Sequence, residues 1–225
     1  MAGDDERDLQ KRAAAAAAAD LVQDGTTVGL GTGSTVALFL PALARRGLSV
    51  RCVATSEATE RQARALGLAV EPFDARIERL DLAVDGADQV DPAGWLVKGG
   101  GGAQTREKIV AAAAERFAVI VSADKVVAAI GPPIPLELMP FGLGATLRLL
   151  SSLGEVRIRD GAGPTPDGGV LADYMGPVGE PGELAARLAA TPGVVDHGLF
   201  PPEMVTEVLI GTADGSVERR EVRAR

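Results

Sequence analysis

Short β-branched runs alternate regularly with helix-compatible segments through the first 125 residues, and this alternation constrains the fold more than any other feature. Four runs have the character of buried strands, at residues 26–30, 48–55, 80–88 and 117–124. Three intervening segments predict helices, at residues 34–46, 56–66 and 104–116. Such alternation is typical of a parallel sheet, so we expect an α/β main domain of Rossmann-like type.

An alanine run at residues 13–19 predicts one more helix, because alanine has the best helix propensity. Leu9, Leu21 and Val22 are its expected apolar edge. The run is short and weakly apolar, acidic residues precede it and Asp20 ends it, so we expect neither a secretion signal nor a membrane span.

The pattern changes at residues 131–142, where four prolines are expected to interrupt regular structure and mark a domain crossing. Helix-like and strand-like segments follow, around a turn-rich stretch at 161–169, and predict a smaller α+β, ferredoxin-like lid domain. The end of the chain predicts two strands joined through Asp214 and Gly215 that return to the first domain. The expected domains are residues 1–130 plus 206–225, and residues 131–205.

The formal net charge of -8 argues against partners that require an extended positive surface, namely nucleic acids and anionic membranes. The single cysteine, Cys52, lies in an apolar run and suits a reducing compartment such as the cytoplasm. Lysine is scarce, because only four of the 23 basic residues are lysines: Lys11, Lys98, Lys108 and Lys125. These positions are candidates for a compact ammonium donor that the arginine fork cannot replace.

A first candidate motif, "GLGTGSTV" at residues 29–36, stands where a predicted strand meets a predicted helix. Small residues there allow backbone amides to approach an anion, and the helix N-terminus adds positive potential. The third glycine of a dinucleotide fingerprint would fall at Ser34 or Val36, so the phosphate of a small metabolite fits better. A glycine turn without a ligand is the alternative.

Asp85 and Asp88 follow a predicted buried strand, at the end where open α/β sheets bind ligands. They could hold sugar hydroxyls or move protons, and a turn around Gly86 that caps the strand is the alternative. Metal ligation is a weaker option, since no histidine or further carboxylate cluster accompanies them, and we expect no metal or cofactor.

The most specific motif is "LVKGGGGAQTREKIV", in which Lys98 precedes four glycines and Glu107 enters the next predicted helix. The glycines carry a large entropic cost, which indicates that the backbone passes close to a ligand or adopts positive φ. For Glu107, catalysis and a favourable interaction with the helix dipole are both open. The only histidine, His197, is expected to be partly exposed near a turn and is a poor candidate for the base.

Taken in order and spacing, "GTGST", "VDGAD", "KGGGGA..REK" and "SADKVV" closely resemble the ribose-5-phosphate isomerase family of the A type. "PGVVDHGLF" and "VLIGT" resemble its C-terminal part, whereas Gln104, Thr105 and the 161–169 loop depart from some relatives. The resemblance implies substrate contacts from Lys11, Thr32, Gly33, Ser34, Thr35, Asp85, Gly86, Ala87, Asp88, Lys98, Gly99, Gly100, Gly101 and Lys125.

The resemblance also implies that ribose 5-phosphate and ribulose 5-phosphate interconvert, in the non-oxidative pentose phosphate pathway and in a homodimer or homotetramer. Glu107 would be the proton acceptor, Asp85 would act in ring opening, Asp88 would bind a hydroxyl, and Lys98 would lie beside the reacting oxygens. Two competing hypotheses are a non-catalytic sugar-phosphate sensor and a transferase or ligase that uses a thioester or a nucleotide.

Overall fold

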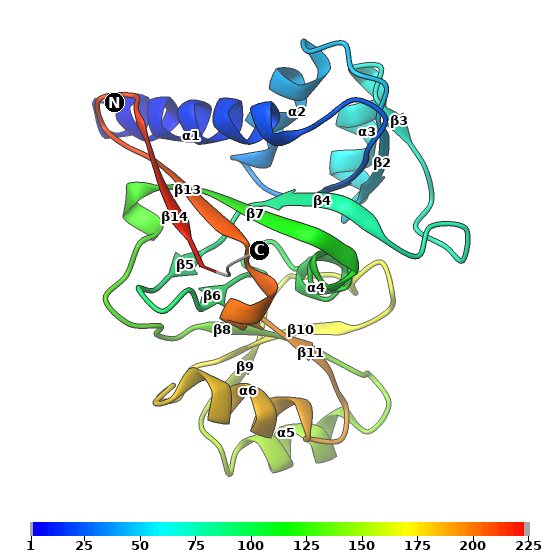
Figure 1. Ribbon diagram of the computed structural model, residues 1–225. Coiled ribbons are helices and arrows are strands. Elements are labelled where there is room, and N and C mark those ends of the chain that lie inside the picture. Colours follow the sequence, from blue (N-terminus) through cyan, green and yellow to red (C-terminus); the bar gives the residue numbers. More distant parts are fainter. Residues whose placement is uncertain (1, 223–225) are drawn as a thin grey trace. The chain divides into compact units, whose positions relative to one another are not determined.

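The computed structural model describes residues 2–222, which form two compact units (Figure 1). Unit 1 comprises residues 2–87, Arg106–Val126 and residues 202–222. Unit 2 comprises Asp88–Thr105 and Val127–Pro201. Among the described residues, no helix combines the length and apolar character needed to cross a bilayer.

Unit 1 is built on a seven-stranded sheet with the order β14-β13-β7-β4-β1-β2-β3. Its strands are β1 (Thr27–Leu30), β2 (Arg51–Ala54), β3 (Ala69–Val70), β4 (Leu80–Asp85), β7 (Ala114–Ser122), β13 (Glu207–Gly211) and β14 (Val217–Glu221). All neighbours pair in parallel except β13 and β14, which form the expected antiparallel hairpin. The predicted Rossmann-like parallel sheet is therefore confirmed.

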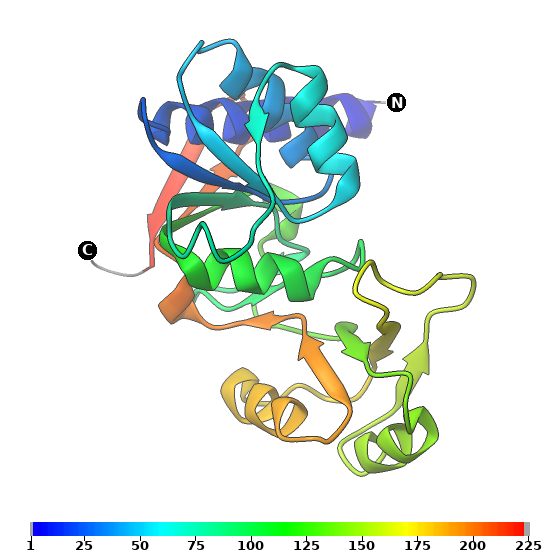
Figure 2. The same ribbon diagram turned by 90° about the vertical axis from the view of Figure 1, so that its right-hand side faces the viewer.

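Helices cover both faces of this sheet, with α1, α2 and α3 on one side and α4 on the other (Figures 1 and 2). They are α1 (Ala2–Leu21), α2 (Val36–Ala44), α3 (Glu57–Ala65) and α4 (Gln104–Ala113). Buried alanines of α1 pack with Phe39 of α2 against Leu30 and Ile120 of the sheet. On the other face Val110 of α4 fills the space that Gly29 leaves, because a Cβ at Gly29 would lie 2.4 Å from Val110 Cγ1.

Two local predictions in unit 1 were wrong. Leu9 is 45% exposed, whereas Leu21 and Val22 pack in the core as expected, together with alanines such as Ala14 and Ala18. The helix expected to run to residue 116 ends at Ala113, because β7 begins at Ala114 and pairs there with Leu80 of β4. Pairing with a neighbouring strand has thus overridden the helix propensity of the last residues in the segment.

Unit 2 has the ferredoxin-like order of elements, β8-α5-β9-β10-α6-β11, as predicted. Their bounds are β8 (Ile134–Leu138), α5 (Leu143–Leu150), β9 (Val156–Ile158), β10 (Val170–Tyr174), α6 (Pro181–Ala189) and β11 (Val194–His197). The four strands pair antiparallel in the order β11-β8-β10-β9, and both helices cover one face (Figure 2). Leu136, Tyr174, Leu184 and Leu188 belong to its core.

Of the four prolines at residues 131–142, Pro132, Pro133 and Pro140 lie outside the strands and helices as expected, but Pro135 does not. Pro135 lies inside β8, a central strand whose five residues are all buried. The predicted domain division also needs correction, since residues 88–105 group with unit 2 rather than with the main domain. The physical reason is a small antiparallel sheet in unit 2, made of β5 (Gln89–Val90), β6 (Leu96–Val97) and β12 (Leu199–Phe200). Two short 3₁₀ turns, η1 (Ala123–Lys125) and η2 (Pro202–Met204), belong to unit 1.

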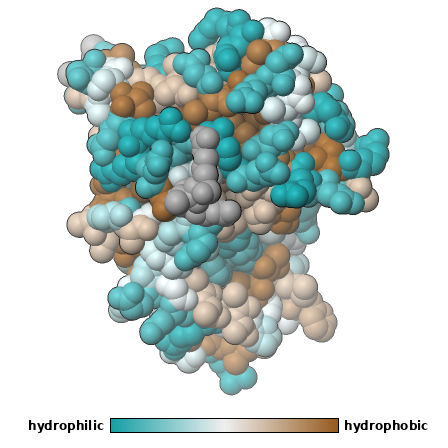
Figure 3. Space-filling view, in the orientation of Figure 1, coloured by the Kyte–Doolittle hydropathy of each residue, from teal (hydrophilic) through white to brown (hydrophobic). Residues whose placement is uncertain are grey.

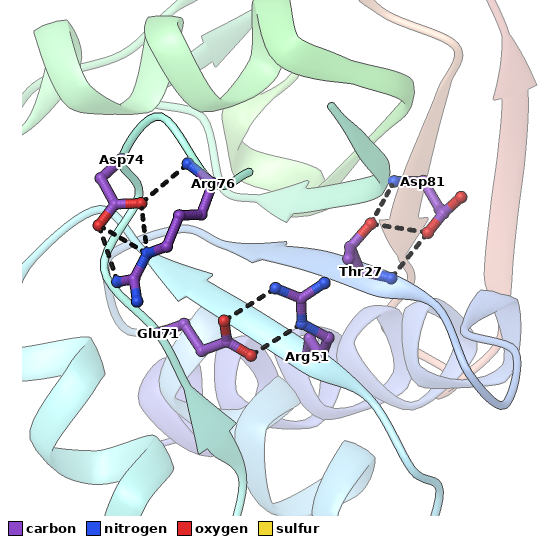
Figure 4. Close-up of polar contacts among 6 residues, drawn as sticks. All are labelled: Thr27, Arg51, Glu71, Asp74, Arg76 and Asp81. Atoms are coloured by element: carbon purple, nitrogen blue, oxygen red, sulfur yellow. Dashed lines mark hydrogen bonds and ion pairs between the residues drawn. The ribbon is translucent and has the colours of Figure 1, made fainter. Parts of the chain in front are cut away.

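Ion pairs and hydrogen bonds secure the amino-terminal region of the unit 1 strands (Figure 4). Asp81 Oδ2 accepts hydrogen bonds of 2.7 Å from both the amide and the hydroxyl of Thr27. The Thr27 amide and hydroxyl together hold the pKa of Asp81 below its usual value. Arg51, at the start of β2, forms a forked pair with Glu71 at 2.8 Å for each bond. A pair between Arg76 and Asp74 stabilises the loop before β4.

Charged residues protect β14, the outermost strand of the unit 1 sheet. Four of the five residues in β14 are charged, and hydrophilic residues dominate the face that carries this strand in Figure 3. Charged edge strands disfavour pairing with another chain. The candidate site lies at the carboxyl ends of the strands in this sheet.

Candidate active site

The glycine loop, residues 31–35, connects β1 to α2 and is anchored by Asp85 at the end of β4. Asp85 Oδ1 accepts hydrogen bonds from the Thr32 amide at 3.0 Å and from the Gly86 amide at 2.7 Å. A Cβ at Gly31 would lie 2.0 Å from Asp85 Cγ, so only glycine permits this approach. The first two sequence motifs are therefore coupled directly, because one carboxylate orients backbone amides of both.

Thr32 directs its hydroxyl towards two threonines that no sequence motif marks, Thr55 and Thr59. Its Oγ1 lies 2.8 Å from Thr55 Oγ1 and 3.4 Å from Thr59 Oγ1. Thr59 Oγ1 in turn donates to the Gly31 carbonyl at 2.8 Å. Thr55 follows β2, and Thr59 is in the first turn of α3. Their polar side chains at the ends of a strand and a helix are the sequence feature that could have marked them as site residues.

The tip of the glycine loop is open. Gly33 and Ser34 are exposed, and Gly33 has φ of 116°, a backbone conformation that favours glycine. Thr35 is the N-cap residue of α2 but makes no side-chain capping bond. Exposed amides at the start of a helix are suited to an anion.

Two half-buried lysines lie near the carboxyl ends of the strands. Lys11 follows Gln10 in α1, whose side chain accepts a 2.9 Å hydrogen bond from the Ala123 amide just after β7. Lys125 closes the 3₁₀ turn that begins at Ala123. Tight packing of α1 fixes this arrangement, because a Cβ at Gly211 would lie 1.8 Å from the Gln10 carbonyl oxygen.

Glu107 lies in the first turn of α4 and is only 6% exposed. The strand β7 follows α4 without an intervening loop, so the start of the helix points towards the carboxyl ends of the strands. Unit 1 therefore places Glu107, Asp85, the glycine loop and both lysines at one edge of its sheet. Gly86 and Ala87 follow Asp85 there.

In unit 2 the backbone around the glycine tract, residues 99–102, forms a tight turn. Gly99 has φ of 102°, and the Gly102 amide donates to the Gly99 carbonyl at 2.9 Å. The Gly100 amide donates to Asp88 Oδ2 at 2.8 Å. Gly100, Gly101 and Asp88 are exposed, so these groups can be reached by a ligand.

Lys98 precedes the tract and is almost fully buried, with 3% exposure. Its amide donates to the Gly198 carbonyl at 2.8 Å. Its ammonium nitrogen lies 5.5 Å from the centroid of the Phe200 ring, within the range of a cation–π interaction. A buried ammonium held in this way is positioned more firmly than a surface lysine.

A buried carboxylate in unit 2, which no sequence motif marks, binds Thr105 at the start of α4. Glu137 of β8 is 2% exposed and accepts hydrogen bonds from the hydroxyls of Thr165, at 2.6 Å, and Thr105. Thr105 stands two residues before Glu107 in the same helix. Nothing local in the sequence connects residues 105, 137 and 165.

His197 differs from its predicted environment. It is 7% exposed within β11, and its Nδ1 accepts a 3.3 Å hydrogen bond from the Leu199 amide. It is therefore a buried histidine rather than a partly exposed one near a turn. Cys52 is fully buried in β2, as expected, and burial raises the pKa of its thiol to about 12.

A family profile and the curated sequence relatives agree on one family. The profile described as ribose 5-phosphate isomerase A (phosphoriboisomerase A) matches residues 51–215. The ribose-5-phosphate isomerase A of Rhodopseudomonas palustris (strain HaA2) is 46% identical over 93% of this chain and 97% of its own length.

Solved structures agree with the sequence relatives. The ribose 5-phosphate isomerase A of Methanocaldococcus jannaschii superposes with a TM-score of 0.89 and 36% identity, covering 95% of this chain and 98% of that one. A D-ribose-5-phosphate isomerase solved with phospho-erythronic acid gives 0.87 and 32%, covering 94% of this chain and 97% of that one. The fold, the order of the motifs and these similarities lead to one conclusion: the chain belongs to the ribose 5-phosphate isomerase A family.

Proposed function

We propose that this chain interconverts ribose 5-phosphate and ribulose 5-phosphate in the non-oxidative pentose phosphate pathway, with Glu107 as the proton carrier. The observation that carries the proposal is the placement of a buried carboxylate, Glu107, at the sheet edge that also holds an amide-rich glycine loop and two lysines. The relatives' names suggest the substrate, and this placement supports the assignment of a base and an anion site.

The reaction requires that carbon 2 of the open-chain aldose lose a proton and that carbon 1 gain one. Glu107 takes the proton from carbon 2 and returns it to carbon 1, so one carboxylate serves as base and then as acid. General acid–base catalysis of this kind typically contributes about 100- to 10,000-fold. The buried position of Glu107 limits the contact of its carboxyl group with bulk water.

Negative charge develops on the two oxygens of the enediolate intermediate. Within unit 2, Lys98 and the amide of Gly101 are donors of the required kind. Loss of a single donor to such a charge typically costs about 2.7 to 4 kcal/mol. The buried, preoriented ammonium of Lys98 supports this role.

The phosphate is held by the Gly33 and Ser34 region at the start of α2, with Lys11 and Lys125 supplying charge. Thr32 contributes mainly by holding the glycine loop in place, since its amide donates to Asp85 and its hydroxyl is directed to Thr55. A helix N-terminus with open amides is a general anion site, and lysines provide point charges for phosphate.

The two aspartates divide the remaining tasks. Asp85 is oriented by two backbone amides, and we assign it the proton transfer that opens the furanose ring. Asp88 is exposed and bonded to the Gly100 amide, and we assign it to a sugar hydroxyl.

The test is conversion of ribose 5-phosphate to ribulose 5-phosphate in excess EDTA by the parent and by Glu107→Gln. Glu183→Gln is the matched control, because Glu183 also lies in the first turn of a helix, α6, and loses the same charge. We expect kcat to fall by about 100- to 10,000-fold in Glu107→Gln and to stay unchanged in Glu183→Gln. Thermal unfolding of all three proteins shows whether folding is intact.

Each contrary outcome has a defined meaning. If Glu107→Gln keeps its activity, Glu107 is not the base and the dipole explanation stands. If the folded parent shows no conversion, the isomerase proposal fails and the sugar-phosphate sensor replaces it.

We further propose that the enzyme acts as a homodimer or homotetramer in the cytoplasm. Support comes from exposed apolar side chains in unit 2, including Phe141 at 88% and Met139 at 49%, since large apolar side chains exposed together often mark an interface. The buried, free Cys52 suits a reducing compartment. Light scattering after size-exclusion chromatography measures the molar mass. The mass of a single chain would contradict the proposed oligomer.

A further inference from the structure

Arg159, just beyond β9, binds the carbonyl side of the glycine tract. Its Nη1 donates to the Gly99 carbonyl at 3.0 Å and to the Gly100 carbonyl at 3.1 Å. Its Nε and Nη2 donate to the two carboxylate oxygens of Asp173 in β10, at 2.8 Å and 2.7 Å. Four of the five guanidinium N–H groups are thus bonded to the protein.

These bonds determine where the amides of the tract point. In a trans peptide the C=O and the N–H point in opposite directions. With the Gly99 carbonyl on Arg159, the Gly100 amide must point away from the guanidinium, and it does so by donating to Asp88 Oδ2 at 2.8 Å. The same rule applies to the Gly100 carbonyl, so the Gly101 amide is also directed away from Arg159.

We propose that Arg159 is a positioning residue, which fixes the Gly99–Gly100 and Gly100–Gly101 peptides so that their amides face Asp88 and the enediolate oxygens. The inference rests on the proposed isomerase function and deepens it. Four glycines in sequence have many accessible conformations, and only an external contact selects one of them. Hydrogen bonding at a carbonyl also strengthens the N–H of the same peptide as a donor.

The arrangement requires an arginine held by an aspartate. Arg159 and Asp173 line a pocket of about 380 Å³ together with Asp88 and Gly100, so packing alone does not fix the guanidinium. The two-point bond to Asp173 fixes its plane instead, while both side chains are about one-fifth exposed, at 18% and 21%. A lysine ammonium lacks the fork that reaches the carboxylate and both carbonyls at once.

The experiment compares Arg159→Met and Arg159→Lys with the control Arg157→Met. Arg157 belongs to the adjacent strand β9, where it lies opposite Asp173, and its own ion pair is with Glu155, at 63% and 59% exposure. Its removal therefore controls for the loss of a neighbouring arginine charge. For each variant we measure kcat and KM with ribose 5-phosphate and the thermal unfolding midpoint. We also record amide NMR spectra of protein labelled with ¹⁵N-glycine.

We expect kcat to fall by about 10- to 100-fold in both Arg159 variants, with KM changed by less than about threefold, because misplacement of donors affects the transition state more than binding. Arg157→Met should match the parent. The Gly100 and Gly101 amide signals should shift in the Arg159 variants and not in the control. The Gly101 signal is assigned with Gly101→Ala, whose added Cβ would meet no atom within 4 Å.

Two results would overturn the inference: unchanged Gly100 and Gly101 signals in Arg159→Met, or equal kcat in Arg159→Met and Arg157→Met. The NMR measurement needs no turnover. If the folded parent lacks isomerase activity while the signals shift, the proposed function fails and the orientation of the tract by Arg159 stands.

Discussion

Gln104, the first residue of α4, has a fully buried side chain whose amide nitrogen and oxygen lack hydrogen-bond partners among residues 2–222. An unsatisfied buried polar group costs about 1–3 kcal/mol. We therefore expect Gln104→Leu to raise the free energy of unfolding by about 1–3 kcal/mol. Urea denaturation measures the change.

A second glutamine provides the control for that prediction. Gln89 donates to the Gly131 carbonyl at 2.8 Å and accepts from its amide at 2.9 Å. Gln89→Leu should lower the free energy of unfolding by about 1 kcal/mol, because it removes partners from Gly131. If Gln104→Leu also lowers the free energy of unfolding, the Gln104 amide is hydrogen-bonded and the prediction is wrong.

Gly31 is a further residue with a sharp steric requirement, set by Asp85. We expect Gly31→Ala to destabilise the fold by about 1–3 kcal/mol, as overpacked substitutions do, and to reduce activity by displacing the glycine loop. Gly163→Ala is the control, since a Cβ there meets no atom within 4 Å. Thermal unfolding and turnover are measured on both, and an unaffected Gly31→Ala would contradict the close contact.

For single residues, the positions of the candidate site groups could be predicted from the sequence, but their hydrogen bonds could not. Asp85 and Glu107 could be assigned to element ends because strand and helix patterns are local signals. Arg159 could not, because its bond to the Gly99 carbonyl joins residues sixty positions apart, and nothing near Arg159 marks it.

Among the elements, β13 depends on a buried carboxylate. Glu207, 2% exposed at its side chain, lies 2.9 Å from Arg116 of β7 and 2.7 Å from Arg219 of β14, and so connects three neighbouring strands. Glu207→Gln should lower the free energy of unfolding by about 3 kcal/mol, since it leaves Arg116 partly buried without its charge partner.

Glu218→Gln is the control within the same hairpin. Its pair with Arg220 is 49% and 37% exposed, and we expect a change of about 0–1 kcal/mol. Equal losses in the two variants, measured by urea denaturation, would show that the burial of Glu207 adds nothing.

Helices and strands were predicted correctly where the local sequence pattern was strong. They were predicted poorly where pairing with a distant strand determined the structure. The parallel strands, the hairpin at Asp214 and Gly215, and the Ser56 cap of α3 follow from local pattern. The strand β8 was missed because Pro135 predicts an interruption, and burial at the centre of a sheet has overridden that tendency.

For the molecule as a whole, Cys52 links stability to pH. Its thiol has a native pKa of about 12, raised by burial, whereas the unfolded thiol ionises near pH 8.5. The unfolded state therefore loses a proton first, and stability falls as pH rises from about 9 towards 12. Between pH 8 and 10 we expect the parent to lose about 1 to 2 kcal/mol more than Cys52→Val.

Denaturation curves at both pH values measure that difference, and all other titrating groups cancel in the comparison. A thiol reagent gives an independent check, since native Cys52 is fully buried and should react only after unfolding. Rapid labelling of the native protein, or equal pH dependence of the two proteins, would contradict the burial of the thiol.

The interleaving of the two units has a consequence for the order in which the protein is synthesised. The partner of β7 on one side is β13, which the ribosome makes only after all of unit 2. Until then the nascent sheet ends at β7, whose residues from Phe117 onwards are buried in the finished protein. An open apolar edge of this kind attracts other chains or chaperones. A chain that stops before Glu207 would keep that edge permanently.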